Sequence, residues 1–192
     1  MHVSFDLDGT LFDTNTAFLS YVKAHPEHSV HGWPASVEEV TSWDYGVGGV
    51  ASAVFEELGG DFSFWSTMAL LPAEPGGFDA LSFALRIGVS SYLTARPPRL
   101  MLPTLRGLEL AGLPSAPVRF DEDKVEGCAL FDVDVLVEDA LHNANAVAEA
   151  GTHVVLLDRP YNQGHAAPNV HRAFGFADAV SIIEEGLAPI LA

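Results

Sequence analysis

The sequence has one cysteine, few basic residues and no long apolar run, and each shortage excludes a class of protein. Cys128 has no partner within the chain, which excludes an intramolecular disulfide and fits a reducing, cytoplasmic location. No apolar run approaches the ~20 residues that a membrane span needs, so we expect no membrane partner. The first residues are acidic rather than basic, and we therefore expect no signal peptide.

The shortage of positive charge narrows the range of partners. The 192 residues include nine Lys and Arg against 26 Asp and Glu, a formal net charge of −17. Lys23 and Lys124 are the only lysines. Such a surface repels polyanions, which argues against binding to nucleic acid. A small anion could still bind, but it would need local positive charge or a metal ion.

The hydrophobic pattern predicts an α/β fold. Hydrophobic residues make up 48% of the chain, which is enough for one domain, or for one domain with a small insertion. Strand-like segments alternate with helical ones, which is typical of a parallel sheet covered by helices on both faces. We expect five strands, at residues 3–7, 89–94, 116–120, 133–137 and 153–157.

One interval is too long for a simple strand–helix–strand unit. The surplus, residues 14–74, predicts helices at 14–24, 36–43, 50–58 and 61–70. Thr14 or Thr16 could cap the first helix, and Ser36 with Glu39 forms a capping-box pattern at the second. The insertion contains all three tryptophans, Trp33, Trp43 and Trp65, among many other aromatics. These side chains could form the core of a helical bundle, and one or two could face a planar ligand.

Two carboxylates are crowded at the end of the first strand, in Asp6-Leu-Asp8-Gly9-Thr10. Asp-Gly is a common turn signal, so a plain turn is the alternative interpretation. Like charges this close repel each other unless a cation lies between them or one is protonated. Packing offers no reason for this arrangement, whereas a catalytic or metal site does.

Polar residues also follow the later strands. In a parallel sheet, function lies at the carboxyl ends of the strands, so we expect these residues to converge on one edge. Each has an ordinary explanation when taken singly, but their combination at successive strand ends favours a site. They are Thr94, Ala95 and Arg96 after the second strand, Lys124 in the loop after the third, Glu138 and Asp139 after the fourth, and Asp158 and Arg159 after the fifth.

The segments Asp6–Thr10, Leu93-Thr94, Lys124 and Glu138-Asp139 resemble the four ordered motifs of the haloacid dehalogenase (HAD) superfamily. The resemblance covers the whole chain. It implies a Rossmann-like core of residues 1–13 and 75–192, with residues 14–74 as a type 1 helical cap.

Three shorter segments are similar to the 5'-nucleotidases of the 5'(3')-deoxyribonucleotidase group. They are Thr41-Ser-Trp43-Asp44, Thr94-Ala-Arg-Pro97 and Leu157-Asp-Arg-Pro-Tyr-Asn162.

The resemblance to the HAD superfamily implies phosphoryl transfer through an aspartyl-phosphate. Asp6 would be the nucleophile and Asp8 the general acid, which then becomes the base. Mg²⁺ would bind Asp6, the backbone carbonyl of Asp8, and Asp139, and the neighbouring Glu138 could act through a metal-bound water. The phosphate would contact Thr94, Ala95, Lys124 and the backbone amides of Gly9 and Thr10. Phe12, Trp43, Tyr45, Arg96 and Asn143 are further candidates for contact with the substrate.

The favoured substrate is a nucleoside monophosphate, because a nucleobase needs an aromatic stacking face. A sugar phosphate or phosphoglycolate is the enzymatic alternative. A non-catalytic binding protein of the same fold is a further hypothesis, disfavoured because the motif residues are all present. A dehalogenase is disfavoured by Asp8, and a nucleic-acid 3'-phosphatase by the net charge. Whether the chain is a monomer or a homodimer stays open.

Overall fold

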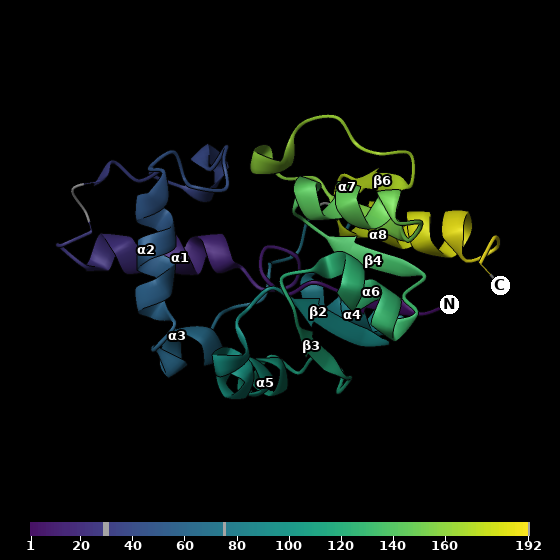
Figure 1. Cartoon of the computed structure of the whole chain (residues 1–192), viewed down its shortest axis with the longest axis horizontal. Coiled ribbons are helices and arrows are strands. Elements are labelled where there is room, and N and C mark those ends of the chain that lie inside the picture. Colours follow the sequence, from purple (N-terminus) through teal and green to yellow (C-terminus); the bar gives the residue numbers. More distant parts are fainter. Residues whose placement is uncertain (29–30, 75, 192) are drawn as a thin grey trace.

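The centre of the computed structural model, which describes residues 1–28, 31–74 and 76–191, is a parallel sheet (Figure 1). Its six strands lie in the order β3-β2-β1-β4-β5-β6. They are β1 (Val3–Phe5), β2 (Ser91–Thr94), β3 (Val118–Phe120), β4 (Val135–Glu138), β5 (His153–Leu157) and β6 (Val170–Ala173). The strand order reverses beside β1, where an open parallel sheet forms its crevice. Asp6 therefore follows the strand at the reversal point.

The predicted α/β class and parallel sheet are confirmed, but the predicted strand count of five is wrong. The sixth strand, β6, pairs with β5 so that Val155 lies opposite His171. It is an edge strand, and three of its four residues are only partly buried. It therefore lacks the apolar run that marks the central strand β4, which is buried throughout.

Helices cover both faces of the sheet, and the alternation of side chains along the strands divides the core in two. Val135 and Val137 of β4 pack on one face with α4 (Ala80–Ile87) and α8 (Phe176–Ser181). Leu136 of β4 packs on the other face with α6 (Lys124–Phe131) and α7 (Leu141–Glu149). The remaining elements of this part are η3 (Pro98–Leu100), α5 (Met101–Leu110), η4 (Pro160–Asn162) and η5 (Ile182–Leu187).

The described residues 14–28 and 31–74 form a largely helical layer to one side of the sheet (Figure 1). It contains α1 (Thr14–Ala24), η2 (Val37–Glu39), α2 (Gly49–Leu58) and α3 (Phe62–Ser66). Phe18 stacks on Phe55 with ring centroids 4.1 Å apart and on Tyr45 at 4.7 Å. These rings form the layer's own core. The division into core and cap domains stays a prediction, and the boundary residue Pro75 lies outside the described residues.

Several helix ends differ from the predictions. Asp13, rather than Thr14 or Thr16, caps α1 by accepting a hydrogen bond from the amide of Thr16 at 3.2 Å. The predicted capping box at Ser36 is wrong, because its side chain makes no capping bond and only the short η2 forms. Asp61 caps α3, which ends at Ser66 instead of continuing to Leu70.

Across residues 1–28, 31–74 and 76–191, no helix combines the length and the apolar character that crossing a bilayer would require.

Candidate active site

Asp6 and Lys124 form a buried ion pair at the reversal point of the sheet. Asp6 directly follows β1, and its amide bonds the carbonyl of Val137 in the neighbouring strand at 2.9 Å. Lys124 is the first residue of α6, where Asp123 caps the helix, so its predicted place in a loop is corrected. Its ammonium group donates to a carboxylate oxygen of Asp6 and to the carbonyl of Leu93. The end of β1, strand β2 and helix α6 thus meet at one lysine.

Three buried carboxylates surround this ammonium group. Oxygens of Asp6, Glu138 and Asp139 all lie within 4.8 Å of one another. Lys124 Nζ is 3.8 Å from Glu138 Oε2, which is buried and makes no hydrogen bond to the described residues. One positive charge therefore faces three acids. Burial raises the pKa of each of the three to about 7, and the neighbouring carboxylates add to this shift.

This cluster fits a divalent cation. Carboxylate oxygens are hard ligands of the kind that Mg²⁺ prefers. Carboxylates bind a metal in their ionised form. With all three acids ionised beside one ammonium group, two negative charges would be unbalanced, which a dication would offset. Glu138 Oε2, which makes no hydrogen bond to the described residues, is a further candidate ligand atom. The predicted metal residues Asp6, Glu138 and Asp139 are thus brought together, whereas the side chain of Asp8 turns to other partners.

Asp139 is held in place from three sides. Thr10 Oγ1 donates to one carboxylate oxygen at 3.2 Å, and the Tyr161 hydroxyl donates to the other at 2.6 Å. The side-chain amide of Asn162 bonds the backbone carbonyl of Asp139 at 2.7 Å. The sequence reasoning did not assign roles to Tyr161 and Asn162. The sequence feature that could have indicated them is the segment Leu157–Asn162, which begins at the last residue of β5. It entered the prediction only through its similarity to the 5'-nucleotidases.

Gly9 is required by both its conformation and its surroundings. Its φ of +78° lies in the left-handed region, which glycine adopts without steric cost. A Cβ added here would collide with Asp139 Oδ2 and would lie 2.9 Å from the Tyr161 hydroxyl. The turn after β1 can therefore approach Asp139 only with glycine at this position.

Asp8 binds a different cation from Asp6. Arg96 donates two hydrogen bonds to it, at 2.8 Å from Nε and 2.7 Å from Nη2, and Thr14 Oγ1 donates a third at 2.7 Å. Burial alone would raise the pKa of Asp8, but the Arg96 guanidinium and its hydrogen bonds lower it below the ordinary value. The two acids of the opening motif therefore differ in environment, and Asp8 is held as a carboxylate.

Arg96 itself is clamped. Its guanidinium lies over the rings of Phe12 and Trp65, 5.3 Å and 4.8 Å from their centroids, and donates to Thr104 Oγ1 at 3.1 Å. Phe12, a predicted candidate for substrate contact, is fully buried, and its ring packs against the Arg96 guanidinium. These contacts fix the position of Arg96, and Arg96 in turn fixes the carboxylate of Asp8.

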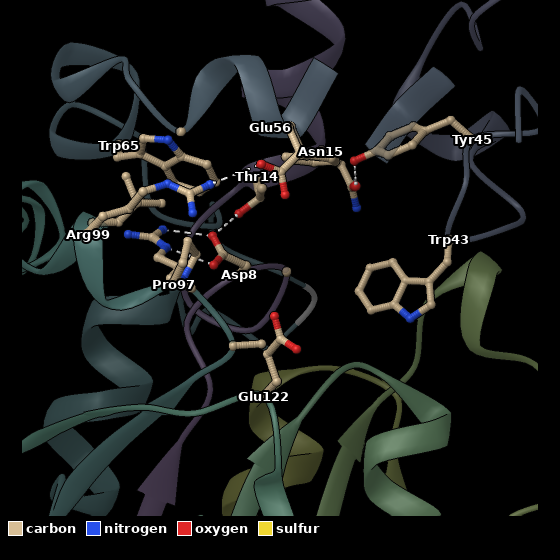
Figure 2. A pocket seen from close by; sticks show the side chains of 16 residues that line it. Asp8, Thr14, Asn15, Trp43, Tyr45, Glu56, Trp65, Pro97, Arg99 and Glu122 are labelled. Atoms are coloured by element: carbon tan, nitrogen blue, oxygen red, sulfur yellow. Dashed lines mark hydrogen bonds and ion pairs between the residues drawn. The ribbon is translucent and has the colours of Figure 1, made fainter. Parts of the chain in front are cut away.

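A cavity of about 330 Å³ opens above Asp8, between the helical layer and the strand ends (Figure 2). Trp43 lies across it from Trp65 and Arg99. Asp8, Gly9, Trp43, Tyr45, Ala95 and Arg96 are the predicted site residues that line it. Its volume is within the range of small-molecule sites.

Thr94 and Asn143 are among the predicted phosphate and substrate residues that do not line this cavity. Thr94 is fully buried, and its hydroxyl accepts a hydrogen bond from the amide of Arg96 at 3.2 Å. Asn143 lies in α7, partly buried, and does not line the cavity. Their proposed contacts with phosphate or substrate stay predictions.

The Arg96 clamp makes a testable prediction about stability. We expect Arg96→Ala to lower the free energy of unfolding by about 3 kcal/mol, because it leaves Asp8 without its partner in a largely buried site. Arg99→Ala is the matched control, since Arg99 pairs with Glu56 at the exposed rim, and it should cost less than about 1 kcal/mol. Urea unfolding measures both. Equal costs for the two variants would contradict a structural clamp.

Comparison with known proteins gives one partial match in sequence and several matches in fold. No family model matches the chain. A protein of Halalkalibacterium halodurans with the name "Putative nucleotidase BH1399" is 32% identical over 99 residues, which is 50% of this chain and 51% of that protein. The match therefore spans about half of the relative.

Solved structures match over nearly the whole chain. The L-2-haloacid dehalogenase of Xanthobacter autotrophicus superposes with a TM-score of 0.63 at 15% identity, covering 97% of this chain and 99% of the other. A haloacid dehalogenase-like family hydrolase of Xanthomonas campestris gives 0.62 at 14% identity, covering 98% and 96%. Together with the motif order, these matches show that the chain has the fold of the haloacid dehalogenase superfamily.

Proposed function

We propose that this protein is a Mg²⁺-dependent phosphatase that hydrolyses a small phosphomonoester through an aspartyl-phosphate on Asp6. The observation that carries the proposal is the buried group of Asp6, Glu138 and Asp139 around Lys124. Asp8 and Gly9, which follow Asp6 closely in the chain, line a cavity of about 330 Å³. Such a group combines a nucleophile, a fixed positive charge and candidate metal ligands at one point.

The first step of the reaction uses Asp6 and Lys124. An oxygen of Asp6 attacks phosphorus, and the bond from phosphorus to the leaving oxygen breaks. Lys124 donates to the phosphoryl oxygens as charge spreads over them, and it needs little reorganisation because it is already buried against Asp6. When bound, Mg²⁺ would offset the carboxylate charges and polarise the phosphoryl group.

Asp8 serves the proton transfers. In the second step, its carboxylate takes a proton from water, the water oxygen attacks phosphorus, and the bond from Asp6 to phosphorus breaks. The pair with Arg96 keeps Asp8 in the ionised form that this step requires. The first step requires the opposite form, in which Asp8 protonates the leaving oxygen. We propose that a bound phosphate dianion supplies the negative charge that favours this protonated form.

The proposed substrate is a nucleoside monophosphate. Trp43, Tyr45, Phe55 and Trp65 give the cavity aromatic walls, which suit a nucleobase. Its two arginines are already paired, Arg96 with Asp8 and Arg99 with Glu56. Glu122 adds a further acid to the lining. The carboxylate of phosphoglycolate would therefore meet negative charge here, and we rank that substrate lower.

The partial match to the nucleotidase of Halalkalibacterium halodurans supports the same substrate class. The dehalogenases among the matched structures do not lead us to propose dehalogenation. In the superfamily resemblance, the second acid of the opening motif marks the phosphatases, and this chain has Asp8 at that position.

A phosphate-release screen tests the proposal. The protein is incubated with nucleoside monophosphates, sugar phosphates and phosphoglycolate, each with Mg²⁺ and with a chelator in excess. We expect release from nucleoside monophosphates that stops with the chelator. Release only from sugar phosphates would refute the nucleotidase assignment, and no release from any substrate would favour a non-catalytic binding protein.

The metal site predicts a stability change that does not depend on activity. Mg²⁺ at about a hundredfold excess over Kd should stabilise the fold by about 2.7 kcal/mol, or roughly 5–10 °C in Tm. Asp139→Asn should reduce this shift strongly. The control Asp132→Asn removes a carboxylate from the left-handed end of α6, where asparagine is tolerated, and should keep the full shift. A full shift in Asp139→Asn would contradict the site.

A further inference from the structure

Trp43 of the helical layer reaches two side chains of the sheet-bearing part. Its indole N–H donates to Nδ1 of His142 in α7 at 3.1 Å. Its ring stacks on Tyr161 with centroids 5.1 Å apart and planes inclined by 19°. The indole is nevertheless 47% exposed. Trp43 is therefore a contact between layers rather than a residue of the bundle core.

Tyr161 continues this contact to the acidic cluster. The same ring that stacks on Trp43 carries the hydroxyl that donates to Asp139 Oδ2 at 2.6 Å. Backbone packing limits other positions for this hydroxyl, because Gly9 lies directly against both Tyr161 and Asp139. Trp43 and Asp139 are therefore separated by a single side chain.

On the opposite side of the cavity, different residues join the helical layer to the sheet-bearing part. There, α3 packs on α5, and Trp65 lies over the buried Arg96. The exposed pair of Arg99 and Glu56, at 3.3 Å, also crosses between the layers, but such pairs contribute little. The layers are thus packed through α3 and α5 on one side of the cavity. On the other side, the helical layer contacts Tyr161 through Asn15 of α1 and through the half-exposed loop residue Trp43, which Figure 2 shows across the cavity from Trp65.

We infer that Tyr161 is a positioning residue that couples the docking of Trp43 to the orientation of Asp139, so that closure of the helical layer strengthens divalent-cation binding. The inference rests on the proposed function for the cation site itself. The physical basis is that hydrogen-bond partners of a metal ligand orient it and tune its affinity. Stacking against Trp43 fixes the plane of the Tyr161 ring and hence the direction of its hydroxyl.

A double-mutant cycle tests the coupling, with Mg²⁺ affinity measured by calorimetry in the absence of substrate. Tyr161→Phe keeps the stacked ring and loses the hydroxyl, and it should weaken Mg²⁺ binding about 10–100-fold. Trp43→Ala keeps the hydroxyl and loses the stack, and it should weaken binding about 5-fold or more. In the Tyr161→Phe background, Trp43→Ala should have no further effect, because its influence passes through the missing hydroxyl.

Two controls separate the coupling from general damage to the fold. Phe62→Ala removes another exposed aromatic of the helical layer and should leave Mg²⁺ affinity unchanged. Trp43→Phe retains a ring that can stack and should restore most of the affinity lost in Trp43→Ala. Should Trp43→Ala fold poorly, Trp43→Leu is the substitute, since it keeps an apolar side chain but loses the ring that stacks on Tyr161.

A second readout uses the reciprocity of the coupling. If the stacking of Trp43 on Tyr161 raises the affinity for Mg²⁺ by some factor, bound Mg²⁺ must shift the equilibrium towards the stacked position of Trp43 by the same factor. Mg²⁺ should therefore protect Trp43 from acrylamide quenching, measured as the difference between wild type and Trp43→Phe. Tyr161→Phe, at saturating Mg²⁺, should abolish that protection.

The possible failures are distinguishable. Unchanged Mg²⁺ affinity in Trp43→Ala would overturn the coupling while leaving the cation site and the proposed function intact. An equal effect of Trp43→Ala with and without the Tyr161 hydroxyl would show that Trp43 acts by another route, and would also overturn it. If the wild type binds no Mg²⁺, both the inference and the proposed cation site are wrong.

Discussion

Asp6→Asn is expected to abolish phosphate release while the protein stays folded. The amide cannot attack phosphorus, and loss of a catalytic nucleophile typically costs about 10⁴-fold or more in kcat. The substitution is nearly isosteric, and it removes one of three crowded acids whose burial is unfavourable. Steady-state kinetics with the best substrate of the screen measures the loss, and circular dichroism checks the fold.

Asp134→Asn is the matched control for Asp6→Asn. Asp134 lies just before β4, at the opposite end of the strand from Asp139, where it accepts a hydrogen bond from the amide of His2 at 2.6 Å. Its loss should leave kcat unchanged. Substantial activity in Asp6→Asn would remove the nucleophile from the proposed mechanism, whatever the behaviour of the control.

Lys124→Ala is expected to damage both catalysis and stability. Losing a preorganised donor to the phosphoryl group should lower kcat about 10²–10³-fold. The same change leaves Asp6, Glu138 and Asp139 without their shared ammonium group, which should lower the free energy of unfolding by about 3–5 kcal/mol. Added Mg²⁺ should recover part of this stability, since it would replace the missing positive charge.

The chain supplies an unusually direct control for Lys124, because it has one other lysine. Lys23 is exposed at the end of α1, where its ammonium group donates to the carbonyl of Ala35 at 2.6 Å. Lys23→Ala should alter neither kcat nor stability by a large amount. For Lys124→Ala, a raised KM with an unchanged kcat would contradict its role in the transition state. If Lys124→Ala does not fold, Lys124→Met keeps most of the buried packing and allows the same comparison.

The sequence predicted the centre of the fold because central strands and strand-end residues have local signatures. Val133–Val137 is nearly all apolar, and the structure confirms a buried strand there, shifted to Val135–Glu138. Asp6, Lys124 and Asp139 were expected to meet because parallel strands end at one edge, and the structure brings them together. Edge strand β6 was missed because half-exposed strands do not carry a continuous apolar pattern.

The contacts that sequence reasoning missed depend on distant parts of the chain. Arg96 pairs with Asp8 across 88 positions, and no local pattern indicates that pair. Tyr161 bonds Asp139 from η4, 22 positions further along the chain. Trp43 was chosen as an aromatic that could face a ligand, but its stacking on Tyr161 required the relative placement of two separate layers.

Acid quenching during a single turnover tests the central claim most directly. The protein is mixed with Mg²⁺ and a phosphate-labelled nucleoside monophosphate, quenched within the first turnover, digested and analysed for labelled peptides. We predict that the label is on the peptide that contains Asp6, and that Asp6→Asn carries none. Label on another residue, or phosphate release with no labelled peptide at any time, would contradict an aspartyl-phosphate on Asp6.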